Sequence, residues 1–203
     1  MKTSKILNRL NINIKNGYIF IRVPKTASQS LNSLLKIKWD HFNANFCRDY
    51  LGEDKWNSLY TFGFVRSPWT RLISWYTYHL KKENLYKNYG KTGFNNWIYD
   101  GCPHHYDKKF KDKIIFPENP LLQKNWLCDL NGDIIVDYVG KYESMENDMK
   151  NICKKIDVPY RELFVVNKSE KINFNLKYTK KSIKIVNDLF DDDFRMFNYQ
   201  RTP

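Results

Sequence analysis

The sequence predicts one α/β domain, residues 1–203, with a central, mainly parallel sheet flanked by helices in a P-loop-like, three-layer fold. Two observations predict this class. Three short apolar runs are typical of strands buried on both faces, and an amphipathic helical pattern follows each run. Repeated strand–helix units indicate a parallel sheet. A length of 203 residues suits one globular domain with a substantial core.

The first expected strand is 18–23, a run of β-branched and aromatic residues that follows the turn pair 16–17. After it, Leu31, Leu34 and Leu35 recur at the spacing of one helix face. This spacing predicts a helix directly after the strand.

The second expected strand is 61–66, and a longer helix follows it. Ser67 supplies a hydroxyl suited to an N-cap, and Pro68 suits the first helical position. His79, far along this helix, is expected to be partly exposed. The apolar residues of the helix form one stripe, made of Trp69, Leu72, Ile73, Tyr76 and Leu80.

The third expected strand is 134–139, and the helix after it should end before Val158-Pro159. A last helix should begin at Thr179. Residues 83–120 are less regular, and we expect them to form an insertion over the acceptor side of a functional site. The two helices carry apolar stripes made of Met145, Met149, Ile152 and Ile156, and of Ile183, Val186, Leu189 and Phe190.

The net charge of +12 implies an anionic partner or substrate but does not say which. No apolar run approaches the roughly 20 residues that cross a bilayer, and the basic N-terminus lacks the apolar region of a signal peptide. We therefore expect a cytoplasmic protein without a membrane span. The cysteines Cys47, Cys102, Cys128 and Cys153 are too widely spaced for a zinc or redox pair, so we expect no metal site and free thiols, with one disulfide as the alternative.

The loop Pro24-Lys-Thr-Ala-Ser-Gln-Ser30 is the first motif that carries chemistry. A short loop between a strand and a helix points free backbone N–H groups and the helix dipole at one spot, which suits an anion. Lys25 adds a positive charge, and three hydroxyls add donors. No glycine lies between Gly17 and Gly52, so the loop is not a true P-loop and should hold a smaller terminal phosphate.

Arg66 and Ser74 form the second motif, within Phe64-Val-Arg-Ser-Pro-Trp-Thr-Arg-Leu-Ile-Ser74. Arg66 ends a predicted strand, at the sheet edge where ligands of α/β proteins bind. A guanidinium fork suits a phosphate dianion, and a hydroxyl can complete its shell. Two phosphate-binding motifs on neighbouring strand–helix units indicate a ligand with phosphates at both ends.

Together, the two motifs resemble those of sulfotransferases that use 3′-phosphoadenosine 5′-phosphosulfate (PAPS), in particular the carbohydrate-type branch. The stretch Arg22-Val-Pro-Lys-Thr-Ala-Ser28 is similar to the corresponding loop of heparan sulfate 2-O-sulfotransferases. Three further stretches are similar to the wider branch and occur in the same order, at 138–143, 166–169 and 193–199.

The resemblance implies a role for each matching residue. Arg66 and Ser74 would hold the 3′-phosphate, and Lys168 and Ser169 would belong to a late loop that closes over the nucleotide. Lys25 would also stabilise negative charge on the bridging oxygen during transfer. The residues that would hold the 5′-phosphosulfate are Lys25, Thr26, Ala27, Ser28, Gln29 and Ser30.

Transfer to a hydroxyl also requires a base, and histidine, with an unperturbed pKa of about 6.5, is the natural choice. His41 lies between the two phosphate motifs and resembles the histidine that this branch carries before its second strand. His41 is therefore the expected base, with an Asp or Glu of the insertion as the main alternative. His104 and His105 lie in the insertion and are expected to be exposed.

The expected activity is sulfuryl transfer from PAPS, without a metal, to a hydroxyl of an acidic or neutral carbohydrate. Trp97, Tyr99 and Tyr106 are candidate stacking surfaces for the sugar. Two other classes stay open. A P-loop-type kinase is disfavoured by the missing glycines and Walker-B Asp. A non-enzymatic nucleotide- or nucleic-acid-binding protein is supported by little beyond the charge, so no nucleic-acid partner is expected.

Overall fold

The computed structural model describes residues 14–26, 28–35, 37, 41–82, 89–90, 93–103, 117, 119–162 and 176–203. The chain divides into two compact units. The first comprises Met1–Val65 and Ile114–Val166 and contains the sheet. The second comprises Arg66–Lys113 and Asn167–Pro203 and, over its described residues, is built from helices. That residues 1–203 form a single domain stays a prediction.

Parallel strands form the sheet of the first unit, in the order β1-β2-β3. Phe20 lies opposite Phe62, and Gly63 lies opposite Val139. Because the strands are parallel, their carboxyl ends lie at one edge of the sheet. The strands are β1 (Tyr18–Ile21), β2 (Tyr60–Val65) and β3 (Tyr138–Lys141). The helices described in this unit are α2 (Ser28–Leu35), α3 (Ala44–Leu51), α4 (Glu53–Asn57), α9 (Lys124–Leu127) and α10 (Met145–Lys155).

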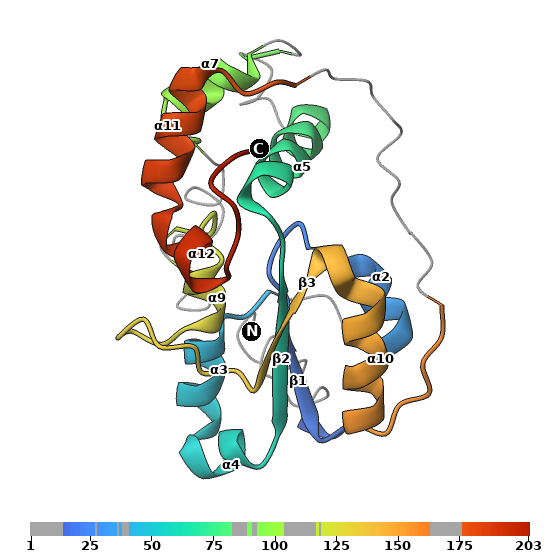
Figure 1. Ribbon diagram of the computed structural model, residues 1–203. Coiled ribbons are helices and arrows are strands. Elements are labelled where there is room, and N and C mark those ends of the chain that lie inside the picture. The colour runs from blue at the N-terminus through green and yellow to red at the C-terminus, as the bar shows by residue number, and fades with distance from the viewer. Residues whose placement is uncertain are drawn as a thin grey trace. The chain divides into compact units, whose positions relative to one another are not determined.

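Different helices cover the two faces of the sheet, as Figure 1 shows. The helices α2 and α10 lie on one face, and α3 and α4 lie on the other. Tyr18 and Phe20 of β1, with Phe62 and Phe64 of β2, point toward α2 and α10, as the pleat of a strand requires for alternate residues. The mixed α/β class with a parallel sheet is therefore confirmed, as are the first two strands. The P-loop-like layering stays a prediction. The core on this face is completed by Leu31, Leu35, Ile37, Met145, Met149, Ile152 and Cys153.

The third strand lies further along the chain than the sequence predicted. The apolar run 134–139 was expected to form it, whereas β3 begins at Tyr138. Ile134 instead pairs with Cys128 in an isolated antiparallel bridge. Between these two residues, the Asp129 carboxylate accepts two backbone N–H groups at 3.0 Å and closes a tight turn. This local turn holds the first part of the apolar run away from the sheet.

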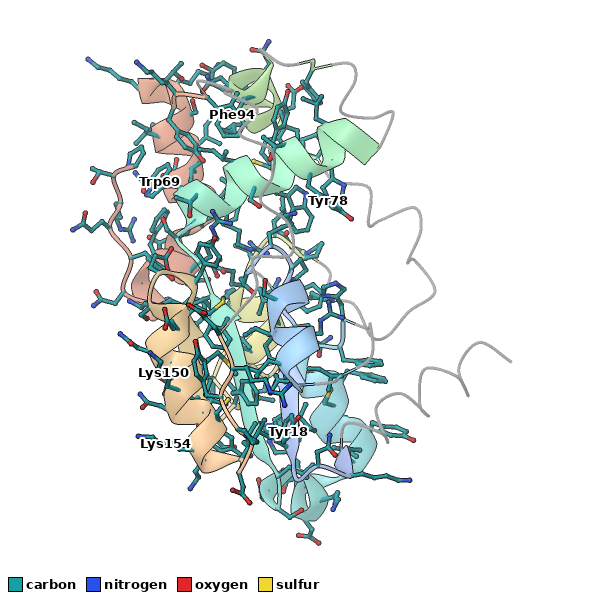
Figure 2. The ribbon with its side chains drawn as sticks, turned by 90° about the vertical axis from the view of Figure 1, so that its right-hand side faces the viewer. Tyr18, Trp69, Tyr78, Phe94, Lys150 and Lys154 are labelled. Atoms are coloured by element: carbon teal, nitrogen blue, oxygen red, sulfur yellow. The ribbon has the colours of Figure 1, made fainter. Side chains whose placement is uncertain are left out.

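Aromatic rings form the core of the second unit. The Trp69 ring lies 5.0 Å from that of Tyr178 and 5.2 Å from that of Phe194, between centroids. Phe94 lies 5.1 Å from Tyr178 and 5.3 Å from Tyr76, and Figure 2 labels Trp69 and Phe94 in this unit. The Tyr178 hydroxyl donates to the Trp69 carbonyl at 2.7 Å. The helices described here are α5 (Pro68–Lys82), α7 (Phe94–Tyr99), α11 (Lys180–Leu189) and α12 (Asp191–Met196).

Helix α5 begins where the sequence predicted. Pro68 is its first residue, and the Ser67 carbonyl accepts the N–H of Arg71 at 2.9 Å, the first bond of the helix. The expectation that His79 is partly exposed was wrong, because its side chain is only 3% exposed and its ring lies 5.2 Å from that of Trp75. Burial of Trp75 and His79 gives α5 a second buried face, which a single apolar stripe does not reveal.

Helix α11 is fixed by its first turn. The Thr179 side chain accepts the N–H of Ser182 at 3.1 Å, and the Ser182 hydroxyl accepts the N–H of Thr179 at 3.0 Å, which together make a capping box. The start predicted at Thr179 is confirmed. Leu189 was expected in the apolar stripe but is exposed, whereas Val186 and Phe190 are buried.

The four cysteines are free thiols, as expected, and all four are buried. Burial raises the pKa of the Cys47 and Cys153 thiols and brings that of Cys102 to about 12. None of the helices in the described ranges is long and apolar enough to cross a membrane.

We predict that Gly140→Ala destabilises the first unit. A Cβ atom at Gly140 would lie 2.5 Å from Cε1 of the Phe64 ring, and that ring is fully buried. Overpacking of this kind costs about 1–3 kcal/mol, measurable as a lower midpoint in urea unfolding. In a Phe64→Leu background, which removes the clashing ring atoms, the same substitution should cost less. An equal cost in both backgrounds would contradict the packing explanation.

Candidate functional site

The loop between β1 and α2 lies at the carboxyl edge of the sheet, where the sequence predicted an anion site. Strand β1 ends at Ile21 and α2 begins at Ser28. The N–H groups of the first turn of α2 have no partner within the helix and face the loop. Thr26, Ser28 and Ser30 are buried, whereas Lys25 is partly exposed. The loop therefore combines helix N–H groups, hydroxyls and one accessible ammonium.

The loop keeps its shape without glycine. The Thr26 hydroxyl donates to the Val23 carbonyl at 2.9 Å, and the Val23 N–H donates to the Ile21 carbonyl at 3.1 Å. Lys25 adopts a φ of 69°, in the left-handed region that ordinarily favours glycine. A non-glycine residue in this conformation is strained and persists only where its surroundings hold it. The bonds of Thr26 and Val23 provide that restraint.

Arg22 connects the loop to the histidine that the sequence singled out. Its side chain is 4% exposed, and its Nη2 makes a long contact, 3.4 Å, with the Ser28 hydroxyl. Its backbone carbonyl accepts a hydrogen bond of 2.7 Å from Nδ1 of His41. Sequence reasoning did not include Arg22 among the site residues. The available signal was a charged residue at the end of an otherwise apolar strand.

His41 is partly exposed and lies beside the ring of Trp126. Its ring lies 5.8 Å from the fully buried Trp126 ring, edge to face. A carbonyl oxygen can only accept, so the bond to Arg22 places the proton on Nδ1. In the neutral imidazole the lone pair is then on Nε2, which is the nitrogen that can take up a proton.

The segment after β3 is tied together by one carboxylate. Asp148 of α10 accepts hydrogen bonds from the Tyr138 hydroxyl at 2.9 Å, from the Lys141 N–H at 2.8 Å and from the Ser144 hydroxyl at 2.8 Å. Burial and this bond to Asp148 raise the pKa of Tyr138 to about 12. The stretch 138–143, singled out by its resemblance, therefore comprises β3 and the start of the turn that leads into α10.

Arg66 and Ser74 belong to the second unit. Arg66 directly follows Val65, the last residue of β2, and its Nε donates to the Thr70 hydroxyl at 2.9 Å. This bond holds the guanidinium along the first turn of α5. Ser74 lies in the second turn of the same helix and is partly exposed.

Several predicted site residues lie outside the described residues. They are Ala27, Lys168 and Ser169, and the same holds for His104 and His105 of the insertion. The backbone of Gln29 belongs to α2, but its side chain lies outside the description.

Of the stacking surfaces expected in the insertion, the structure contradicts Trp97. Trp97 is fully buried in the second unit, where its ring lies 5.4 Å from that of Tyr76. The Lys181 ammonium lies 4.3 Å from the centroid of the Tyr99 ring and covers one of its faces. Trp97 is therefore a core residue, whereas Tyr99 is partly exposed and its role as a stacking surface stays a prediction. Tyr106 lies outside the described residues.

A cavity of about 630 Å³ lies elsewhere in the first unit, at the C-terminal end of α10, lined by Lys150, Lys154 and Tyr160 among others. Figure 2 labels both lysines on α10. Helix α10 starts near the carboxyl end of β3 and returns along the sheet, so its C-terminal end lies at the opposite edge from the loop. The cavity is therefore separate from the candidate site.

Two of the comparisons with known proteins point to sulfotransferases. A profile of the Sulfotransferase family matches residues 8–200. Carbohydrate sulfotransferase 10 of Xenopus laevis is 22% identical over 251 aligned residues, which cover 96% of this chain and 68% of that protein. An uncharacterised protein of Archaeoglobus fulgidus is 27% identical over 113 residues, covering 55% of this chain and 79% of that protein. No solved structure matches significantly.

The family profile covers nearly the whole chain, including the loop after β1, His41, and the Arg66 motif. The chain belongs to the sulfotransferase family.

Proposed function

We propose that the protein transfers the sulfuryl group of PAPS to a hydroxyl of a carbohydrate. Family membership supports sulfotransferase activity, and the similarity to a carbohydrate sulfotransferase supports the acceptor class. The observation that carries the proposal is the hydrogen bond between His41 Nδ1 and the Arg22 carbonyl. This bond holds His41, the proposed proton acceptor, next to Arg22, where the proposed anion-binding loop begins.

The donor site in this proposal uses the loop and the second motif. Lys25 and the residues 26–30 bind the 5′-phosphosulfate, because the Ser28 and Ser30 hydroxyls and the helix N–H groups there suit a terminal anion, while the Thr26 hydroxyl, which donates to the Val23 carbonyl, holds the loop. Arg66 and Ser74 bind the 3′-phosphate, the group for which a guanidinium fork is suited. Lys168 and Ser169 complete the nucleotide site. PAPS supplies the sulfuryl group when bound.

His41 and Lys25 perform the chemistry in this proposal. Nε2 of His41 accepts the proton of the acceptor hydroxyl as its oxygen bonds to sulfur, while the bond from sulfur to the bridging oxygen breaks. The Lys25 ammonium stabilises the negative charge that develops on that bridging oxygen. Adenosine 3′,5′-bisphosphate is the leaving group, and the step requires no metal.

The test is transfer of ³⁵S from labelled PAPS to a panel of glycans, lipids, small alcohols and tyrosyl peptides, with and without EDTA. We expect labelled glycans and an unchanged rate in EDTA. A P-loop-type kinase would instead require Mg²⁺ and transfer phosphate from ATP. A steep salt dependence of binding to random duplex DNA, without any ³⁵S transfer, would favour the nucleic-acid-binding alternative.

We predict that His41→Ala lowers kcat by roughly 10²-fold or more while leaving the affinity for adenosine 3′,5′-bisphosphate nearly intact, because a general base contributes 10²–10⁴-fold. His41→Asn is the matched control for structure. Its side-chain amide can still donate to the Arg22 carbonyl, but it has no basic nitrogen. Near-normal turnover in His41→Asn would refute the assignment of His41 as the base.

We predict that Lys25→Ala lowers kcat by roughly 10²–10³-fold, because it removes a charge that acts on the bridging oxygen. Lys25→Gly should be equally inactive but more stable than Lys25→Ala by about 1 kcal/mol, since glycine accepts the positive φ at this position. Thermal unfolding and steady-state kinetics separate the two effects. An active Lys25→Ala variant would contradict the catalytic role.

We predict that Arg66→Ala weakens the binding of adenosine 3′,5′-bisphosphate by roughly 10–100-fold, because a hydrogen bond to a charged group contributes about 1.5–3 kcal/mol. Adenosine 5′-monophosphate lacks the 3′-phosphate, so its affinity should be the same for both proteins. Calorimetry with the two nucleotides makes the comparison. An equal loss for both, or no loss for either, would contradict a role for Arg66 at the 3′-phosphate.

A further inference from the structure

Thr70 holds the arginine that is proposed to bind the 3′-phosphate. Its hydroxyl oxygen accepts the Nε–H of Arg66 at 2.9 Å, and the hydroxyl proton is donated to the Ser67 carbonyl at 3.3 Å. The two bonds are compatible, because a hydroxyl has one proton to donate and lone pairs with which to accept. One hydroxyl therefore links the Arg66 side chain to the backbone at the start of α5.

Thr70 and Ser74 lie on the same face of α5. Residues four apart on a helix lie one above the other, with about 6 Å between them along the axis. This face is the more open one, because Thr70 is exposed and Ser74 is partly exposed, whereas Trp69 and Trp75 are buried. The bond to Thr70 therefore brings the Arg66 guanidinium to the face that carries Ser74. Both groups assigned to the 3′-phosphate thus belong to one helix face, as a shared ligand requires.

The first turn of α5 is held from its buried side. The ring of Trp69, labelled in Figure 2, is 4% exposed, and its Nε1 donates to the Gln200 carbonyl at 2.9 Å. The backbone carbonyl of the same residue accepts the Tyr178 hydroxyl at 2.7 Å. These two bonds fix the backbone next to Thr70, and the bond to the Ser67 carbonyl fixes its side-chain rotamer. The hydroxyl that receives Arg66 therefore has a defined position.

A guanidinium that is already oriented binds a phosphate better than a mobile one. A mobile arginine side chain loses rotamer freedom when it binds, and this loss weakens the affinity. The guanidinium is planar, so a bond at Nε fixes the plane in which its other N–H groups lie. A fixed plane suits the fork geometry of a bidentate contact with phosphate. The bond to Thr70 therefore orients Arg66 before the nucleotide arrives.

We propose that Thr70 is a positioning residue of the 3′-phosphate site, which orients Arg66 and does not itself touch the nucleotide. The inference rests on the proposed function and adds to it the residue that orients the phosphate-binding guanidinium. Thr70 acts on donor binding, through Arg66, and not on the reacting atoms. Its loss therefore raises KM for PAPS and leaves kcat nearly unchanged.

The test is calorimetry with adenosine 3′,5′-bisphosphate and adenosine 5′-monophosphate on variants of the full chain. Thr70→Val keeps the shape of the side chain and removes the hydroxyl. We expect it to weaken bisphosphate binding about 3–10-fold, the cost of ordering one mobile side chain, and to leave monophosphate binding unchanged. Thr70→Ser restores the hydroxyl and should bind both nucleotides as the wild type does. Steady-state kinetics should show a matching rise in KM for PAPS in Thr70→Val alone.

A double-mutant cycle separates positioning from direct contact with the phosphate. In an Arg66→Ala background, Thr70→Val should cause no further loss of bisphosphate affinity, because no guanidinium remains to be oriented. A second loss of the same size in that background would show that Thr70 contacts the phosphate itself, and would overturn the inference.

Thr77→Val is the matched control, because Thr77 lies on the same helix and its hydroxyl also donates to a backbone carbonyl, that of Ile73, at 2.8 Å. It should leave the affinity for both nucleotides unchanged. Wild-type bisphosphate affinity in Thr70→Val, or an equal loss for both nucleotides, would overturn the inference. A selective loss in Arg66→Ala would then leave the proposed function standing. Failure of the wild type to bind the bisphosphate, or to transfer ³⁵S to any acceptor, would overturn the proposed function itself.

Discussion

The hydrogen bond from His41 Nδ1 to the Arg22 carbonyl is the interaction on which the candidate site depends. Arg22 is the first residue after β1, so its carbonyl has a position fixed by the sheet. The bond therefore anchors His41, which lies in an irregular segment, to a backbone group that the sheet holds in place. It also selects the tautomer, because a carbonyl cannot donate. Orientation and protonation of the proposed base both follow from one contact.

The loop beside His41 keeps a tight turn without glycine, because a side-chain hydrogen bond holds its backbone. Lys25 takes the left-handed conformation, and the Thr26 hydroxyl fixes the turn by donating to the Val23 carbonyl. Strain at Lys25 is acceptable because the same residue supplies the charge that the proposed chemistry needs. The absence of glycine in this loop is thus compatible with a defined anion site, of a compact kind.

Aromatic residues occur in two different settings in the chain. Trp69, Phe94 and Tyr178 pack against one another and form the core of the second unit. Phe46 and Tyr50 stack on the outer side of α3, where exposure increases away from His41. Composition alone therefore does not distinguish a ring of the core from an exposed ring.

The sequence by itself determined the α/β class, the first two strands, the helices that follow and the position of the loop between β1 and α2, because hydrophobic period and turn residues are local properties. The sequence predicted that β3 begins at residue 134, whereas it begins at Tyr138, and that His79 is partly exposed, whereas it is buried. Whether an apolar run joins a sheet depends on competing local bonds, such as those of Asp129, and burial depends on what packs against a helix. The tertiary structure alone brought Arg22 to His41, nineteen residues apart, and buried Trp97 while exposing Tyr50. These pairings arise from long-range packing, which no local pattern encodes.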